Sequence, residues 1–170
     1  MRAYYFAEDS SDNCQPHDSG IEVSPETLEK LGVFYARLTG TEEEKQAQLD
    51  SIAKERNYNS FDVINLSTLT PDLDKKLDVF FDEHLHEDEE IRCVLQGSGY
   101  FDVRDLDDKW IRIHVVKDDF IIVPHGIFHR FALDSNKKIT AKRLFKQNPS
   151  WIAIPRDQAT ENPFRISYLE

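Results

Sequence analysis

The sequence predicts a mainly β protein with helices, of the α+β class, in which antiparallel strands form a sandwich or barrel. Two observations predict this fold class. After about residue 82, short apolar runs alternate with turn residues at roughly 8–12 residues per strand, a spacing typical of sandwiches and barrels. Before residue 82, capping patterns favour short helices. The length of 170 residues suits a single domain. Within it we expect an N-terminal helical part at about 21–82, a barrel core at about 83–156 and a polar tail at 157–170.

Capping patterns predict three helices in the N-terminal part. A Ser-Pro-Glu sequence opens the first, a Thr-x-x-Glu capping box opens the second, and a Thr-Pro-Asp sequence opens the third. The third also carries an apolar stripe of Leu73, Leu77 and Phe80. The expected elements are helices at 24–32, 41–56 and 70–82, strands at 33–38 and 61–66, and a polar loop at 8–20.

Six apolar runs predict the strands of the barrel. Asp-rich or Gly-containing segments separate them, and we expect Gly97-Ser-Gly99 to be one such break. The expected strands lie at 91–96, 100–104, 110–117, 120–124, 129–133 and 139–145.

Composition excludes several classes of protein. Lys plus Arg total 21 and Asp plus Glu total 32, so the formal net charge is −11. This acidic balance argues against binding to nucleic acid or to an anionic membrane, because both require a cationic surface. Apolar runs all stay well short of the ~20 residues that a membrane span needs. The two cysteines, Cys14 and Cys93, indicate no disulfide framework and a reducing compartment. We therefore expect a cytoplasmic monomer, with an additional nuclear location left open.

A His-x-His sequence and a nearby carboxylate predict a metal site. On an extended backbone His84 and His86 point to the same face, because strand side chains alternate. Glu90 opens the next strand, and Arg92 shares its face. Two imidazoles and a carboxylate form a facial set that leaves positions open on iron(II).

A second segment supplies a third imidazole. Pro124 and Gly126 impose a tight turn, after which His129 begins a strand and Phe131 shares its face. A shell of three His and one Glu would leave two positions on a six-coordinate ion for substrate or dioxygen. His125, in the variable slot of the turn, competes with His129, but the turn should direct it away from the barrel interior.

Each feature also has a simpler interpretation. A His-x-His sequence among acids is often a solvated face, and we expect the other acids of this run, Glu83, Glu87, Asp88 and Glu89, to be surface residues. His17 and His114 lie outside both segments, so we interpret them as ordinary surface or strand residues. We interpret Cys93, which has the opposite parity from Glu90, as a buried inert thiol. The joint spacing of the two segments favours the metal site.

The paired spacing resembles the two cupin motifs, which implies a cupin double-stranded jelly-roll barrel with the N-terminal helices packed outside. Two positions depart from the generic second cupin motif, which usually has Gly where Asp118 stands and Asn where Leu133 stands. A more specific resemblance rests on four segments: Glu83-His-Leu-His-Glu-Asp-Glu-Glu-Ile-Arg92, Gly99-Tyr-Phe-Asp-Val-Arg-Asp105, Pro124-His-Gly-Ile-Phe-His-Arg-Phe131 and Arg143-Leu-Phe145. With these segments the sequence looks like the acireductone dioxygenase family of methionine salvage, and the resemblance covers about residues 20 to 156.

This resemblance implies the site and the reaction. The metal ligands become His84, His86, Glu90 and His129, holding one Fe²⁺ or Ni²⁺ per chain. The implied substrates are O₂ and an acireductone, 1,2-dihydroxy-3-keto-5-methylthiopentene. The iron form would yield 4-methylthio-2-oxobutanoate and formate, and the nickel form 3-methylthiopropanoate, formate and CO.

Three other residues are candidates for roles in this site. Arg92, a permanent cation on the ligand face, is the candidate catalytic residue, with a salt bridge to a neighbouring acid as the alternative. Phe80 and Phe131 are candidates for the substrate pocket, with core packing as the alternative. Two other functions stay open: a metal cupin with isomerase or hydrolase chemistry, in which zinc would polarise a carbonyl, and a non-catalytic ligand-binding cupin.

Overall fold

The computed structural model describes residues 1–150 and 152–170. The helices are α1 (Pro25–Lys30), α2 (Glu42–Glu55), α3 (Leu73–Phe81) and α4 (Pro163–Leu169), with a 3₁₀ turn at Arg156–Gln158. The strands are β1 (Arg2–Phe6), β2 (Asp18–Glu22), β3 (Phe34–Arg37), β4 (Ser60–Ser67), β5 (His84–Leu85), β6 (Glu90–Arg104), β7 (Trp110–Val116), β8 (Asp119–Val123), β9 (His129–Leu133), β10 (Lys138–Phe145) and β11 (Ile154–Pro155).

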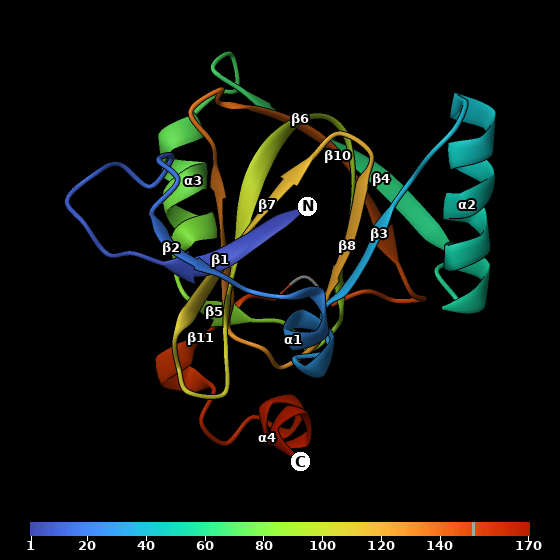
Figure 1. Ribbon diagram of the computed structural model, residues 1–170. Coiled ribbons are helices and arrows are strands. Elements are labelled where there is room, and N and C mark those ends of the chain that lie inside the picture. Colours follow the sequence, from blue (N-terminus) through green and yellow to red (C-terminus); the bar gives the residue numbers. More distant parts are fainter. Residues whose placement is uncertain (151) are drawn as a thin grey trace.

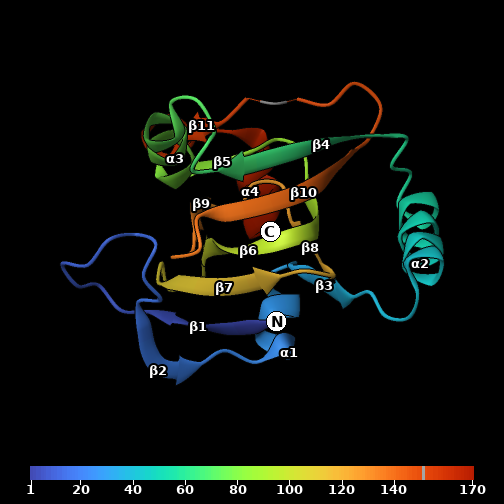
Figure 2. The ribbon, with the colours of Figure 1, turned by 90° about the horizontal axis from the view of Figure 1, so that it is seen from above.

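The strands form two antiparallel sheets that share β6. One sheet runs in the order β11-β5-β9-β6-β7-β1-β2, and the other in the order β4-β10-β6-β8-β3. The sheets curve around a common interior (Figures 1 and 2). This arrangement confirms the predicted barrel class.

The shared strand crosses from one sheet to the other near Gly97. Residues Glu90–Cys93 pair with β8, whereas Ser98–Arg104 pair with β7. Gly97 has φ +73, and a side chain there would collide with the backbone carbonyl of Lys138. The sequence prediction of a break at Gly97-Ser-Gly99 was therefore wrong, because the glycine allows a bend within one continuous strand.

The helices lie on the outside of the barrel, with α3 and α2 on opposite sides in Figure 1. Two of the three predicted caps are confirmed: Ser24 caps α1, and Thr41 with Glu44 forms the capping box of α2. The predicted opening of the third helix at Thr70 was wrong, because α3 starts at Leu73 after Asp72, which has a positive φ and makes no side-chain cap. The stripe of α3 packs against the main core through Leu73, Leu77 and Phe80. This packing places α3 over the side of the barrel where the metal-ligand candidates lie.

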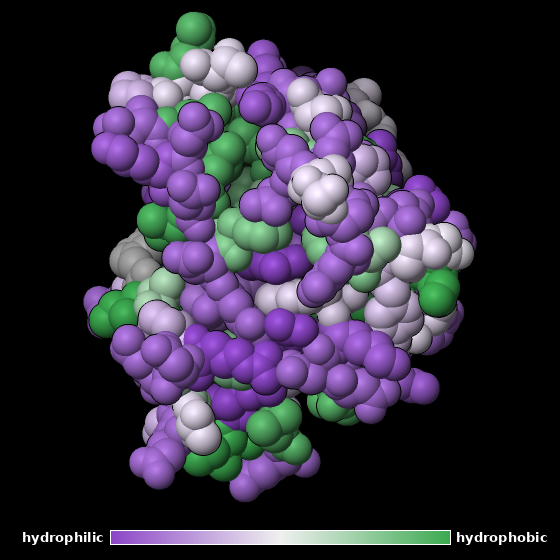
Figure 3. All heavy atoms as spheres, turned by 90° about the vertical axis from the view of Figure 1, so that its left-hand side faces the viewer, coloured by the Kyte–Doolittle hydropathy of each residue, from purple (hydrophilic) through white to green (hydrophobic). Residues whose placement is uncertain are grey.

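The core is mostly apolar, and one of its buried charge clusters surrounds Asp102. Asp102 accepts two hydrogen bonds from Arg112, at 2.7 and 2.9 Å, and one from Arg130 at 2.9 Å. Arg112 also donates to the backbone oxygens of Asn13 and Gln15, which ties the N-terminal loop to the barrel. Hydrophilic residues dominate the outer face shown in Figure 3. Among the described residues, helices lack the combined length and apolar character needed to span a membrane.

The N-terminal part holds more β structure than the sequence predicted. β1 and β2 were not predicted, and β2 overlaps the expected loop at 8–20. Since β1 to β4 all join the sheets, β structure starts well before the predicted barrel boundary at residue 83. The C-terminal tail contains α4, in which Arg165 donates to the backbone oxygen of Gly126 at 3.0 Å.

We expect Gly97→Ala to lower the free energy of unfolding by at least about 3 kcal/mol, because a Cβ adds a backbone collision to the strain of a positive φ. Gly20→Ala is the matched control. Gly20 has φ +77 but open space around it, so strain alone should cost about 1 kcal/mol. Urea unfolding of both variants measures the difference, and equal losses would contradict a packing requirement at Gly97.

Candidate metal centre

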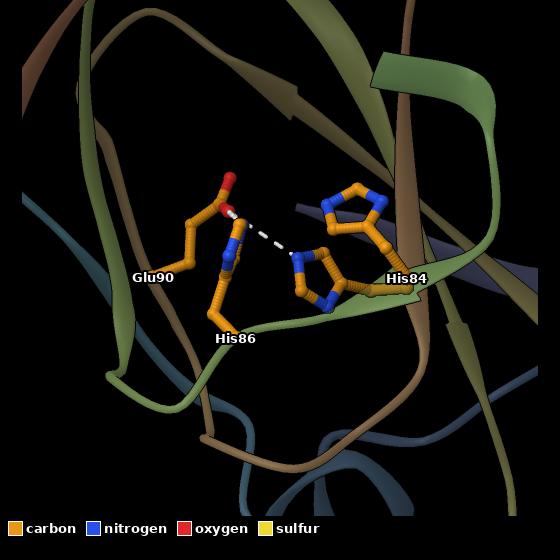
Figure 4. Close-up of side chains that lie close together, drawn as sticks. His84, His86 and Glu90 are labelled. Carbon is orange, nitrogen blue, oxygen red and sulfur yellow. Dashed lines mark hydrogen bonds and ion pairs between the residues drawn. The ribbon is translucent and has the colours of Figure 1, made fainter. Parts of the chain in front are cut away.

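Four side chains from three neighbouring strands converge inside the barrel. His84 lies on β5, His86 directly follows that strand, Glu90 begins β6 and His129 begins β9. The sheet brings them together because β9 lies between β5 and β6, with His84 paired to His129. Figure 4 shows His84, His86 and Glu90 pointing toward one another. The spacing predicted this set, and the structure places all four residues together.

The geometry of the four residues suits a metal ion. One potential ligand atom from each residue lies within 4.8 Å of the others. The Glu90 carboxylate is 3.2 Å from Nε2 of His86 and 3.3 Å from Nε2 of His129. Three imidazoles and one carboxylate supply a mixed nitrogen and oxygen donor set that suits iron or nickel. The residues therefore form a His₃–Glu group that could hold one ion.

Backbone carbonyls fix which nitrogen of each imidazole faces the centre. Nδ1 of His84 lies 2.6 Å from the oxygen of Asp82, and Nδ1 of His129 lies 3.0 Å from that of Ile127. Nδ1 of His86 lies 2.9 Å from the oxygen of Ile152. A carbonyl only accepts, so each Nδ1 carries the proton when the ring is neutral, and each Nε2 is left with a lone pair for a metal.

Electrostatics keep most of the set ready to bind a cation. Burial lowers the pKa of His84 to about 4, with the neighbouring His129 adding to the effect. Burial alone would raise the pKa of Glu90, but the charge of Arg92 and hydrogen bonds from His129 and His86 hold it well below its usual range. Burial likewise opposes protonation of His86, yet its hydrogen bond to Glu90 raises the pKa above the ordinary value. Near neutral pH, a proton on His86 therefore competes with the metal.

The His₃–Glu group lines one end of a cavity of about 250 Å³. Arg92 lines the same cavity, and its Nη2 lies 3.3 Å from Glu90. Phe80 and Phe131 also line it, with their ring centroids 6.4 Å apart. Most of the remaining wall is apolar: Ile64, Leu66, Val79, Val94, Phe101, Ile139, Ala141 and Ala153. The cavity thus combines a charged end with an apolar body.

Sequence reasoning missed a second arginine in this cavity. Arg143 lines it and binds Asp62 through two hydrogen bonds of 2.7 and 2.5 Å. The alternation of side chains along β10 could have indicated this residue, because Arg143 shares a face of the strand with Ala141 and Ile139, which line the same cavity.

The acids that flank the ligands were predicted to be surface residues, and this was only partly right. Each is partly buried and bonded to a distant part of the chain. Asp88 accepts from the backbone nitrogen of Ser150 at 2.5 Å, and Glu89 accepts from the hydroxyl of Tyr58 at 2.8 Å. Glu87 accepts from the side chain of Asn162, and Glu83 from Arg104 and Arg156. These partners lie 21 to 75 residues away along the chain, so no neighbouring residue indicates them.

The remaining predicted residues fall outside the centre. The ring of His125 contacts Phe164 of α4 rather than the metal group. His114 is a strand residue, as predicted. The surface-or-strand interpretation of His17 was wrong, because it is buried in the N-terminal loop and bonds to the backbone oxygens of Ala7 and Asp12. Cys93 is buried as predicted, and burial raises the pKa of its thiol to about 11.

Comparison with known proteins identifies the family. The model of the ARD/ARD′ family matches residues 2–153. This chain belongs to the ARD/ARD′ family. Acireductone dioxygenase 1 of Coprinopsis cinerea is 49% identical over 99% of this chain and 96% of its own length. The acireductone dioxygenase of Yarrowia lipolytica is 45% identical over 100% of this chain and 98% of its own. The family resemblance predicted from the motifs is confirmed.

A solved family structure supports the fold. Acireductone dioxygenase from Bacillus anthracis, with a cadmium ion in its active centre, matches with a TM-score of 0.68 at 28% identity. The match covers 76% of this chain and 86% of that chain. The predicted cupin fold is thereby confirmed.

We expect His86→Ala to remove metal binding, because only three of the four ligands remain. The barrel should stay folded, because the imidazole of His86 is partly exposed. His125→Ala is the matched control, since His125 lies in the adjoining motif but outside the group. Metal content by elemental analysis checks both variants. Full metal in His86→Ala, or metal loss in His125→Ala, would reverse the assignment.

Metal affinity should rise with pH, because the ion must displace a proton from His86. We expect more protons to be released per ion at pH 6 than at pH 9, since the pKa of His86 is raised whereas His84 and Glu90 are already deprotonated at both values. Calorimetric titration in two buffers of different ionisation enthalpy counts these protons. Equal proton release at the two pH values would contradict the raised pKa of His86.

Proposed function

We propose that this protein is an acireductone dioxygenase that cleaves 1,2-dihydroxy-3-keto-5-methylthiopentene with O₂, as in methionine salvage. The observation that carries the proposal is the His₃–Glu group at the charged end of an apolar cavity, in a chain of the ARD/ARD′ family. The iron form would give 4-methylthio-2-oxobutanoate and formate. The nickel form would give 3-methylthiopropanoate, formate and CO.

The charge of the cavity suits an anionic enediol. Arg92 balances the negative charge of Glu90, so a bound divalent ion leaves two positive charges at this end of the cavity. When bound, the metal supplies Lewis acidity and a template for two substrate oxygens. Arg92 can stabilise negative charge that develops on the substrate, because its guanidinium is permanently charged and held in the cavity wall.

The apolar body of the cavity suits a thioether tail. The ring of Phe131 contacts those of Phe80 and Phe101, with centroid distances of 6.4 and 5.1 Å. Sulfur makes favourable contacts with aromatic rings, and burying the tail removes apolar surface from water. We therefore propose that Phe80 and Phe131 bind the methylthioethyl group and exclude water from the reacting end.

Oxygen uptake tests the proposal. Protein loaded with Fe²⁺ under anaerobic conditions should consume one O₂ per acireductone and yield formate without CO, whereas the Ni²⁺ form should also release CO. A zinc-dependent isomerase, a hydrolase or a non-catalytic module predicts no uptake. Absence of uptake by protein that holds iron at full stoichiometry would overturn the proposed function.

We expect Arg92→Met to lower kcat by roughly 10²–10³-fold while the metal content stays unchanged, because a preorganised cation is lost and the four ligands remain. Steady-state oxygen uptake and elemental analysis of the same sample check the result. Unchanged turnover would reduce Arg92 to a salt-bridge partner of Glu90.

A further inference from the structure

The strand that carries the first two histidines has little backbone support. β5 consists of two residues, His84 and Leu85. It pairs with β9 through His84↔His129 and with the equally short β11 through Leu85 and His84. A strand this short has few ladder hydrogen bonds, so its position depends heavily on side chains around it.

Glu83, the residue directly before His84, ties this strand to two other elements. Its carboxylate accepts from Nε and Nη2 of Arg104, at 3.0 and 3.1 Å, in a two-point contact. It also accepts from Nη1 of Arg156 at 2.7 Å. Arg104 ends β6, the strand that begins with Glu90, and Arg156 follows β11. The carboxylate of Glu83 therefore links the strand of His84 to β6, which carries Glu90, and to the segment that follows β11.

Both arginines are themselves held in place. The guanidinium of Arg104 lies 3.9 Å from the ring centroid of Trp110 and donates to the backbone oxygen of Asp108 at 2.7 Å. Arg156 donates to the carboxylate of Asp108 at 2.7 and 2.9 Å. The side chains of Glu83 and Arg104 are 21% and 20% exposed, so the contact is better shielded than an open surface pair.

We propose that Glu83 is a positioning residue for the metal centre, holding β5 at the distance from β6 that lets His84 and His86 share an ion with Glu90. The inference rests on the proposed function in one respect, because it takes the His₃–Glu group as the metal site. Glu83 is absent from that group and from the lining of the cavity, so it acts through the ligands rather than on substrate.

Chelator competition tests this role without any substrate. Glu83→Gln should weaken Co²⁺ and Ni²⁺ affinity by about 10–100-fold and shift the visible absorption bands of bound Co²⁺, because the carboxamide carries no negative charge between the two guanidiniums and its NH₂ group cannot accept the second hydrogen bond from Arg104. Asp118→Asn is the matched control. Asp118 pairs with Lys45 and has the same 21% exposure, and its positive φ suits Asn. Its affinity should stay within about threefold of wild type.

Arg156→Gln removes the ion pair with Glu83 at its more exposed partner and should also weaken metal affinity. Arg156→Lys should restore part of that affinity. These variants replace Glu83→Gln if that protein fails to fold. The inference would be overturned if folded Glu83→Gln, or folded Arg156→Gln, had the same metal affinity and Co²⁺ bands as Asp118→Asn. The proposed function would then remain intact. A wild-type chain that binds neither ion would overturn both.

Discussion

One strand that serves two sheets sets the geometry of this protein. β6 pairs with β8 and β10 over its first half and with β7 and β9 over its second half. The bend at Gly97 makes this possible, since no side chain fits beside the carbonyl of Lys138. Because Glu90 and Arg92 lie at the start of this strand, the closure of the barrel also decides where the anionic ligand and its arginine point. Fold and site share the same backbone constraint.

The centre is preorganised by groups outside it. Three backbone carbonyls orient the imidazoles, and these carbonyls come from the end of α3, the turn before β9 and the segment before β11. The carbonyl of Ile152 matters most in this respect, because it belongs to a segment 66 residues away from His86. The orientation of His86 therefore depends on the packing of this C-terminal segment against the barrel.

The sequence predicted those features that depend on local chemistry. The caps of α1 and α2 are set by residues three positions apart. The four ligand candidates could be predicted from their spacing, because side chains alternate between the two faces of a strand. Features decided by distant partners were not predictable in this way. β1 is a strand because it pairs with β7, more than 100 residues later, and His17 is buried by contacts within an irregular loop.

The acidic run beside the ligands illustrates the same limit. Residues 82 to 90 include six acids, and such a run is typical of a solvated face when the neighbouring sequence offers no partner for the carboxylates. In the structure four of them, Glu83, Glu87, Asp88 and Glu89, accept hydrogen bonds from a guanidinium pair, an asparagine, a backbone amide and a tyrosine hydroxyl, respectively. A run of acidic residues can thus lie partly buried around a site when cations and hydrogen-bond donors from distant parts of the chain bind its carboxylates.

The two arginines of the cavity differ in how their charge is used. Arg143 faces a carboxylate of its own, Asp62, in a two-point contact that largely balances its charge. Arg92 faces Glu90, but that carboxylate also lies against His86 and His129 and belongs to the His₃–Glu group. Once a cation shares Glu90, less of the negative charge is left for Arg92. In an apolar cavity with reduced screening, an under-compensated guanidinium attracts an anionic substrate strongly. This difference in pairing favours Arg92 over Arg143 as the candidate for the proposed catalytic role.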